Sequence, residues 1–423
     1  MKIQLPYGKC GHTVDVPAKN LLAVLKPKGL KSDKSADELI RHALRSPKGT
    51  ETLSKILAKK TKKDSVVIVV DDHTRPCPTH QMMIPLLDEL CAAGIRDEQI
   101  LILFSSGSHR TTKPEEAEQL LGAEVASRIK YISNESWGED FVDVGTTKKG
   151  TPVFVKKAYM DADVRILTGD VEIHYFAGFG GGRKSILPGI VKYSTIQDNY
   201  KRNFFDPNSQ PAKLDGNPMY ENMTEAARLA GVDFTINVVQ DDHGVVGAFA
   251  GDFDSVLRRG AALVEQIYKA EAPEKADIVI TSANGAPHDI DLYQAYKALH
   301  LALNVVKDGG IIILVAECPE AAGNKNYEDW MRKYKTKEEM KAELEKEFNI
   351  GGHKAYYNHL AAERVTLFLV SAMPKEDVEA VFKFRHAATP QEALEKAFQL
   401  KGKDATVIIA PEGSTTLLGI RKK

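Results

Sequence analysis

Three short runs of consecutive apolar residues, rich in valine and isoleucine, stand out in the first half of the chain. They cover residues 65–70, 99–104 and 165–168. A run of this length without polar alternation is typical of a parallel strand that is buried on both faces of a sheet. Helical patterns follow the first two runs. The pattern therefore predicts an α/β fold with a mainly parallel sheet.

The elements around these runs are indicated by alternation, capping residues and breakers. Residues 1–17 alternate like a strand pair, and Ser35 with Glu38 forms a capping box that opens a helix reaching about Leu44. A helix over 79–93 is stopped by Gly94, and another begins near Lys113. The other elements predicted in this half are a hairpin of 235–239 with 245–250 and a helix over 255–269.

The second half repeats the alternation of strands and helices. Residues 270–275 form a short polar break that contains a proline, and we expect the domain boundary there. Thr389, Pro390 and Glu392 give the last helix its N-cap, its first position and a capping box. The predicted strands are 277–281, 310–316, 365–370 and 405–410, and the predicted helices are 293–306, 336–348 and 390–400. The expected domains are 1–270 and 271–423, both α/β.

Polar, chemically capable residues follow each of the three apolar runs in the first half. Asp72 and Arg75 follow the first run, His109 follows the second, and His174 and Lys184 follow the third. Ligands of open α/β sheets bind outside the carboxyl ends of the strands. We therefore expect the three loops to converge on one site.

The loop after the third run, residues 169–188, combines five glycines with His174 and the triplet Arg183-Lys184-Ser185. Glycines let backbone N–H groups approach an anion, and a lysine can bind a phosphate or act as a nucleophilic amine. A Walker A loop needs glycine where Arg183 stands. We interpret the segment as a cofactor or phosphate cradle; its candidate binding residues are Gly180, Gly181, Gly182, Arg183, Lys184 and Ser185.

Composition and charge narrow the class of protein. A formal net charge of −1 over 423 residues argues against a general electrostatic grip on nucleic acid or anionic membranes. No apolar run approaches the roughly 20 residues that span a bilayer, and the N-terminus lacks an apolar signal core. The four cysteines are scattered, without metal or disulfide spacing. These features favour a cytoplasmic protein; a homo-oligomer is left open.

Each candidate also has a plainer structural interpretation. His174 could be a hydrogen-bonded loop residue, and His109 could cap a helix. Arg75 could pair with Asp71 or Asp72 as a structural ion pair. The spacing of Tyr293 and Lys297 on one helix face is also common in helices without function.

Several motifs together resemble the lactate racemase family over most of the chain. They are Asp72-His73-Thr74-Arg75-Pro76, Gly107-Ser108-His109-Arg110, the run from His174 to Ile190, Leu214-Asp215-Gly216-Asn217-Pro218, and Leu292-Tyr293-Gln294 with Lys297. The resemblance implies two α/β domains with a cofactor in the interdomain cleft. It also implies a nickel-pincer nucleotide, a pyridinium-3-thioamide-5-thiocarboxylate mononucleotide that holds nickel.

The resemblance implies roles for individual residues. Lys184 matches the lysine that tethers the nucleotide as a thioamide, and His109 and His174 match the paired acid/base histidines. Substrate or cofactor contacts are implied for Arg75, Tyr293, Gln294 and Lys297. Asp72 matches a position near the cofactor phosphate or the substrate pocket. Cofactor-biosynthesis proteins are implied as partners.

Tyr200 departs from the family pattern. Where the family carries a histidine as the protein's nickel ligand, gapless alignment from Lys184 and Pro188 puts Tyr200. A phenol with a reference pKa of about 10 is a poor ligand unless the metal deprotonates it. The metal could be held by Tyr200, by another side chain, or by the cofactor alone.

The expected function is therefore racemisation or epimerisation of a 2-hydroxy acid by removal and return of a hydride. A flat keto acid can take hydride back on either face, and a histidine on each side can serve the hydroxyl of each enantiomer. Two alternatives stay open. A conventional NAD-dependent 2-hydroxy acid dehydrogenase is disfavoured because no G-x-G-x-x-G follows the first apolar run. A nucleotide- or phosphate-binding homologue without racemase activity is kept open by Tyr200.

Overall fold

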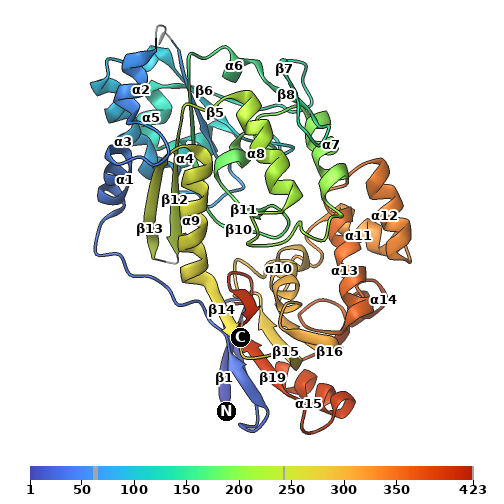
Figure 1. Cartoon of the computed structure of the whole chain (residues 1–423). Coiled ribbons are helices and arrows are strands. Elements are labelled where there is room, and N and C mark those ends of the chain that lie inside the picture. The colour runs from blue at the N-terminus through green and yellow to red at the C-terminus, as the bar shows by residue number, and fades with distance from the viewer. Residues whose placement is uncertain (61–64, 242, 422–423) are drawn as a thin grey trace. The chain divides into compact units, whose positions relative to one another are not determined.

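The computed structural model describes residues 1–60, 65–241 and 243–421. The chain divides into two compact units. One is Leu30–Glu265, and the other joins Met1–Gly29 to Gln266–Lys423. Each unit contains its own six-stranded sheet (Figure 1). The α/β class predicted from the apolar runs is confirmed.

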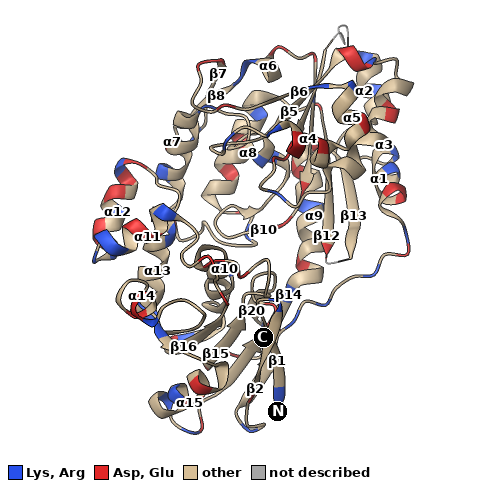
Figure 2. Ribbon diagram, turned by 180° about the vertical axis from the view of Figure 1, so that it is seen from behind, with Lys and Arg blue, Asp and Glu red and all other residues tan. Residues whose placement is uncertain are grey.

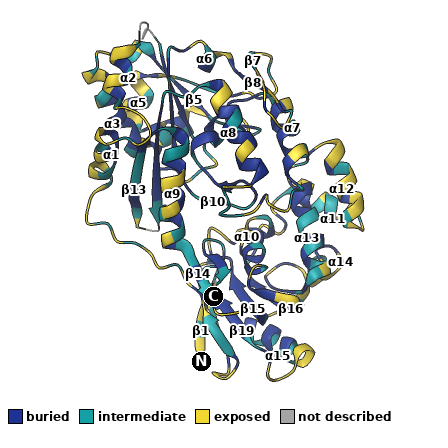
Figure 3. Cartoon of the chain, viewed as in Figure 1, coloured by how far each residue is buried: buried dark blue, intermediate teal, exposed yellow. Residues whose placement is uncertain are grey.

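The sheet of the unit Leu30–Glu265 has the strand order β13-β12-β9-β4-β5-β6. Its strands are β4 (Val66–Val70), β5 (Ile100–Phe104), β6 (Lys130–Ser133), β9 (Val164–Asp170), β12 (Phe234–Asp241) and β13 (Gly244–Gly251). The three predicted strands β9, β4 and β5 are parallel neighbours, with Ile68 opposite both Ile166 and Ile102. All five residues of β4 are buried, as its uninterrupted apolar run predicts. The neighbouring strand β5 is also mostly buried (Figure 3). The predicted hairpin is the antiparallel pair β12–β13.

Helices and small hairpins complete this unit. The capping box of Ser35 and Glu38 is present at the start of the first helix. The helices are α1 (Ala36–Arg45), α2 (Leu53–Lys59), α3 (Thr79–Ala92), α4 (Pro114–Leu121), α5 (Ala123–Arg128), α6 (Lys157–Met160), α7 (Tyr193–Asn203), α8 (Pro218–Ala230) and α9 (Phe253–Tyr268), with 3-10 turns η1 (Asp97–Gln99) and η2 (Gly182–Ser185). The hairpins pair β7 (Phe141–Thr146) with β8 (Pro152–Lys156), and β10 (Ile173–His174) with β11 (Gly178–Phe179).

The second unit has the sheet order β18-β17-β16-β15-β19-β3, with every pair parallel. Its strands are β1 (Lys2–Tyr7), β2 (Cys10–Asp15), β3 (Leu21–Val24), β14 (Lys269–Ala272), β15 (Ala276–Ser282), β16 (Val306–Val315), β17 (Thr366–Val370), β18 (Arg385–Ala387), β19 (Val407–Ala410) and β20 (Leu417–Ile420). Its helices are α10 (Leu292–Ala302), α11 (Lys325–Lys333), α12 (Lys337–Lys346), α13 (Gly352–Arg364), α14 (Lys375–Ala380) and α15 (Pro390–Lys401).

The first 29 residues lie in a different unit from the one expected. The sequence placed them in a domain covering 1–270, whereas the structure groups Met1–Gly29 with the C-terminal part of the chain. The reason is pairing and burial: Leu21 of β3 lies opposite Val407 of β19, and Leu5 and Val14 belong to a buried cluster with Ile278. Local patterning predicted the strand pair within residues 1–17, but neither β3 nor the unit to which these strands belong.

Two further elements differ from expectation. The polar break at 270–275 contains most of β14, which pairs in parallel with β20, so the segment is partly a strand. At the N-terminus of α15, the hydroxyl of Thr389 accepts from the N–H of Glu392 as predicted, but the carboxylate of Glu392 accepts from the N–H of Ala388. Which backbone N–H donates to the Glu392 carboxylate depends on the path of the chain just before the N-cap.

Acidic and basic residues are interspersed along the helices, as in α11 and α12 (Figure 2). The charge distribution therefore agrees with the balanced net charge. Across the described residues, no helix combines the length and apolar character needed to cross a bilayer.

Candidate functional site

The loops after β4, β5 and β9 meet at the carboxyl end of the sheet. The N–H of Gly107, after β5, donates to the carbonyl of Gly189, after β9, at 2.9 Å. A Cβ on Gly189 would lie 2.7 Å from the Cβ of Ser105, so only glycine allows this approach. The expected meeting of these loops follows from the adjacency of their parallel strands.

Asp72 and His109 form a direct pair across two of these loops. His109 Nδ1 lies 2.8 Å from Asp72 Oδ2. The other carboxylate oxygen accepts from the Thr74 hydroxyl at 2.6 Å and from its N–H at 3.1 Å. Burial opposes ionisation of Asp72, but these hydrogen bonds, led by the one to His109, lower its pKa below the ordinary value. Asp72 was expected near the cofactor phosphate or the substrate; here it orients an imidazole.

His174 lies on the short hairpin β10–β11, where its partner is Gly178. Its Nδ1 accepts from the N–H of Ala177 at 3.2 Å and faces that of Phe176 at 3.5 Å. The ring meets Phe176 edge to face, with 4.3 Å between centroids. Backbone amides and an aromatic ring therefore fix the orientation of this imidazole.

Asn217 explains why the motif 214–218 accompanies the histidine loop. Its amide oxygen caps α8 by accepting from the N–H groups of Met219 and Tyr220. Its Nδ2 donates to the carbonyl of Phe176 at 3.0 Å. One fully buried side chain thus joins the start of α8 to the segment that carries His174.

The glycines of the expected cradle are used largely within the protein. The N–H of Gly180 donates to the carbonyl of Glu172 at 2.7 Å, and that of Gly182 donates to the side-chain oxygen of Asn237 at 3.0 Å. Gly181 has φ 76°, and a Cβ there would lie 2.6 Å from the carbonyl oxygen of Asp170. Close packing is therefore a sufficient reason for these glycines. Asn237, buried in the apolar strand β12, was missed, although a polar residue in such a strand is a usable signal.

Arg183 and Ser185 also face inward. The Arg183 guanidinium is 0% exposed, donates to the carbonyls of Ala177 and Phe179, and lies over the ring of Tyr220. The Ser185 hydroxyl donates to the carbonyl of Thr168 at 3.3 Å. Both were predicted to bind the cofactor; in this structure both hold the loop.

Lys184 is the member of the triplet with an unusual amine. Burial, followed by the nearby positive charge of Arg75, lowers the pKa of Lys184 to about 7. The carboxylates of Glu172 and Asp71 act in the opposite direction but do not outweigh burial. An amine with this pKa is substantially neutral near neutral pH and can act as a nucleophile.

A carboxyl pair beside Lys184 was not anticipated as part of the site. Asp71, Asp170 and Cys77 bring possible metal-ligand atoms within 4.8 Å of one another. Burial raises the pKa of Asp71, and burial together with Glu172 and Asp71 raises that of Asp170 to about 8. Without a bound cation, this pair therefore retains a proton near neutral pH.

Arg75 is close to these charges and remains partly open, with 38% of its side chain exposed. Its guanidinium lies 3.9 Å from the Glu172 carboxylate, which favours the charged form despite burial. The plainer interpretation expected a structural ion pair with Asp71 or Asp72, but the carboxylate at ion-pair distance is that of Glu172. The exposed remainder leaves Arg75 able to contact an anion.

Tyr200 does not fit the place of a metal-binding imidazole. It lies on α7, is 9% exposed, and its ring meets Phe176 at 5.5 Å between centroids. Burial raises its pKa to about 12, which disfavours the phenolate that a metal would require.

Tyr293, Gln294 and Lys297 lie in the other unit, at the start of α10. The Asp291 side chain caps this helix by accepting from the N–H of Gln294 at 2.6 Å. Lys354, which sequence reasoning missed, is buried with its Nζ 3.7 Å from the centroid of the Tyr293 ring, and it donates to the Tyr293 carbonyl. These two contacts hold Tyr293 in position.

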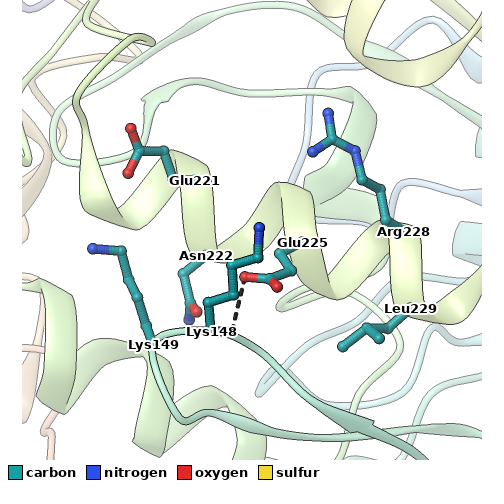
Figure 4. Close-up of a pocket in the computed structure, with 7 residues that line it drawn as sticks. All are labelled: Lys148, Lys149, Glu221, Asn222, Glu225, Arg228 and Leu229. Carbon is teal, nitrogen blue, oxygen red and sulfur yellow. Dashed lines mark hydrogen bonds between the residues drawn. The ribbon is translucent and has the colours of Figure 1, made fainter.

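A separate surface pocket of about 600 Å³ lies between the turn after β7 and α8 (Figure 4). The N–H of Lys148 donates to Glu225 at 2.9 Å, and the pocket is lined by both acidic and basic side chains. No residue predicted for the site lines this pocket, so it is distinct from the loops above.

Comparison with known proteins identifies the family of the chain. A family model described as the lactate racemase N-terminal domain matches residues 7–212, and one described as the lactate racemase C-terminal domain matches residues 271–418. The chain is 33% identical to a lactate racemase of Thermoanaerobacterium thermosaccharolyticum over 343 residues, 80% of this chain and 79% of the relative. It is 30% identical to a lactate racemase of Lactiplantibacillus plantarum, over 97% of this chain and 98% of the relative.

Solved structures support the same assignment. The lactate racemase apoprotein of Thermoanaerobacterium thermosaccharolyticum superposes with a TM-score of 0.91 at 30% identity, with all of both chains covered. A Thermotoga maritima protein shares the fold, with a TM-score of 0.66 at 20% identity over 93% of this chain and all of that one. The matches extend across both units, and the chain belongs to the lactate racemase family of isomerases.

Proposed function

We propose that the chain racemises or epimerises a 2-hydroxy acid while carrying a nickel-pincer nucleotide tethered through Lys184. The observation that carries this proposal is a lysine amine with a pKa of about 7 at the carboxyl end of β9, beside loops that hold His109 and His174. Family membership supports the reaction class. The substrate is a lactate-like or larger hydroxy acid.

The chain's residues divide the work. The neutral amine of Lys184 suits covalent attachment of the nucleotide. When bound, the nucleotide supplies hydride-accepting and hydride-donating chemistry. Arg75 holds the substrate carboxylate, while His109 and His174 address the hydroxyl group. Tyr293, Gln294 and Lys297 of α10 are proposed to bind the substrate or polar groups of the nucleotide, with Lys354 behind Tyr293.

For nickel, we propose no protein ligand at the position where the family pattern has a histidine. Because Tyr200 does not fit as a ligand, no protein ligand is assigned at that position, and no step is assigned to the metal. Metal analysis of loaded protein tests this point. A Tyr200→His variant is expected to retain more nickel per tethered nucleotide during dialysis against a chelator. Equal retention in both proteins would contradict a missing ligand at residue 200.

Chiral analysis of enantiopure 2-hydroxy acids and aldonic acids tests the function. The chain is produced together with the cofactor-biosynthesis proteins, and intact mass reports whether Lys184 carries an adduct. The loaded protein is expected to invert at least one substrate, and His109→Ala and His174→Ala are expected to lose that activity. An unmodified Lys184 in cells that load a known lactate racemase would refute the tether.

Running the reaction in heavy water tests how the hydrogen moves. A returned hydride leaves the α-carbon largely free of solvent deuterium, whereas proton abstraction labels it. Tight nucleotide binding without inversion of any substrate would instead favour the binding homologue that Tyr200 keeps open. Appearance of reduced NAD on mixing with a hydroxy acid would favour a dehydrogenase.

A further inference from the structure

The two histidines of the site have opposite partners at the same ring nitrogen. Nδ1 of His109 faces the carboxylate of Asp72 at 2.8 Å, whereas Nδ1 of His174 faces the N–H of Ala177 at 3.2 Å. A carboxylate accepts hydrogen bonds and a backbone N–H donates them. The neighbours therefore require a proton on Nδ1 of His109 and a lone pair on Nδ1 of His174.

The acceptor role of Asp72 is set by its own surroundings. Asp72 is 1% exposed, and Thr74 donates to its Oδ1 through both the hydroxyl and the N–H. The other oxygen, Oδ2, is thereby directed to His109. A buried carboxylate satisfied in this way is a rigid acceptor.

The acceptor role of His174 is set by the fold of its loop. The N–H of Ala177 belongs to the tight segment between β10 and β11, and the carbonyls of Phe176 and Ala177 are held by Asn217 and Arg183. The backbone cannot turn its N–H away without breaking these bonds. A proton on Nδ1 of His174 would confront a fixed donor.

We propose that the neutral imidazoles are held in opposite tautomers, with a lone pair on Nε2 of His109 and a proton on Nε2 of His174, and that Asp72 is the positioning residue for His109. The catalytic roles that follow from these tautomers rest on the proposed function. His109 is the group that takes the hydroxyl proton, while His174 donates a hydrogen bond to the substrate oxygen.

The atoms balance in the half-reaction that begins at His109. The hydroxyl proton moves to Nε2 of His109, giving an imidazolium that faces Asp72. The nucleotide, when bound, would supply the acceptor for the α-hydrogen and its electron pair, and the substrate would be left as a keto acid. When the hydride returns to the opposite face of the flat keto acid and His109 gives its proton back to the oxygen, the product is the other enantiomer and the imidazole is neutral again.

Nitrogen NMR of the full-length protein tests the tautomers without requiring turnover. The histidine rings are labelled with ¹⁵N, and the two residues are assigned from the spectra of His109→Gln and His174→Gln. At a pH where both rings are neutral, the protonated nitrogen is expected to be Nδ1 in His109 and Nε2 in His174. The same tautomer in both rings would overturn the proposal.

Asp72→Asn is the decisive variant because it preserves shape. Thr74 N–H requires an acceptor, so the asparagine oxygen is expected to face Thr74 and its NH₂ to face His109. His109 should then move its proton from Nδ1 to Nε2, while the His174 signals stay in place. An unchanged His109 tautomer would show that Asp72 does not set it.

Activity of the loaded protein gives the second readout. Asp72→Asn is expected to lower kcat on the order of 10⁴-fold, the size of the loss when the same change is made in a Ser-His-Asp triad. Retention of wild-type kcat would overturn the positioning role. Opposite tautomers without turnover of any hydroxy acid would refute the proposed function while leaving the tautomer assignment intact.

Discussion

Lys184 and Arg183 are adjacent in sequence and have opposite surroundings. The Arg183 guanidinium is enclosed and donates to three loop carbonyls, whereas the Lys184 amine has neighbouring charges of both signs and a pKa of about 7. A run of two cations suggested a common role in anion binding. The side chains in fact divide between holding the loop and presenting an amine.

The reactivity of Lys184 should follow its lowered pKa. In the unmodified protein we expect acetylation of Lys184 by a trace of acetic anhydride to rise with pH and to level off above a midpoint near 7. Acetylation rises with pH because only the deprotonated amine is nucleophilic. A lowered pKa means that the amine loses its proton at a lower pH than an ordinary lysine. Peptide mass spectrometry measures the labelled fraction. Lys201 on the same chain is a control, and a Lys184 midpoint near 10 would contradict the expectation.

Arg183 should be important for stability before any cofactor binds. Arg183→Met leaves the carbonyls of Ala177 and Phe179 without their donor, at a cost of about 2–4 kcal/mol in the free energy of unfolding. Arg183→Lys should recover only part of this, because one ammonium cannot reproduce the guanidinium fork. Chemical denaturation of unloaded protein measures both variants. Unchanged stability with impaired cofactor loading would instead favour direct cofactor contact.

At the scale of elements, the loop between β9 and α7 contains the short hairpin β10–β11 and the 3-10 turn η2, and two buried asparagines from outside the loop hold it. Asn237 receives the N–H of Gly182, and Asn217 ties Phe176 to α8. The N–H of Gly182, which donates to Asn237, and the N–H of Gly180, which donates to the carbonyl of Glu172, are groups that the sequence suggested for phosphate binding. The loop is thus rigid because its own polar groups are satisfied internally.

Gly181 offers a test of that rigidity with a matched control. Gly181 and Gly216 have similar φ values, 76° and 72°, so alanine meets a comparable backbone penalty at both. A Cβ at 181 would also lie 2.6 Å from the Asp170 carbonyl oxygen, whereas the nearest atom at 216 is Lys213 Cε at 3.9 Å. Gly181→Ala is therefore expected to cost roughly 2 kcal/mol more than Gly216→Ala in chemical denaturation. Equal losses of stability in the two variants would mean that the loop shifts to accommodate the added Cβ.

At the scale of the whole molecule, the chain begins and ends in the same unit. Met1–Gly29 supplies the edge strand β3 and the hairpin β1–β2 to the unit completed by Gln266–Lys423, while Leu30–Glu265 forms the other unit. The residues with the strongest chemical indications, from Asp72 to Lys184, belong to Leu30–Glu265. Tyr293, Gln294 and Lys297 belong to the other unit.

The division of the chain into two units predicts which strands are destabilised when a substitution near the N-terminus creates a cavity. Leu5 is fully buried in the cluster that contains Ile278 and Ile311, so Leu5→Ala should cost about 2–5 kcal/mol. Hydrogen exchange should accelerate in β15 and β16 and remain unchanged in β4 and β5. Ile68→Ala, in the core of Leu30–Glu265, is the matched control with the reverse pattern. Faster exchange of β4 in Leu5→Ala would contradict the grouping.

The sequence by itself determined the α/β class, the apolar strands and the meeting of three loops. Uninterrupted valine and isoleucine runs are most stable as strands buried on both faces of a sheet. The carboxyl ends of neighbouring parallel strands lie at the same edge of that sheet. Only the tertiary structure decided the unit of Met1–Gly29, the inward turn of Arg183, and the partners of Asp72 and His174. Those outcomes depend on which distant backbone groups need a hydrogen bond, and local residue patterns do not encode that information.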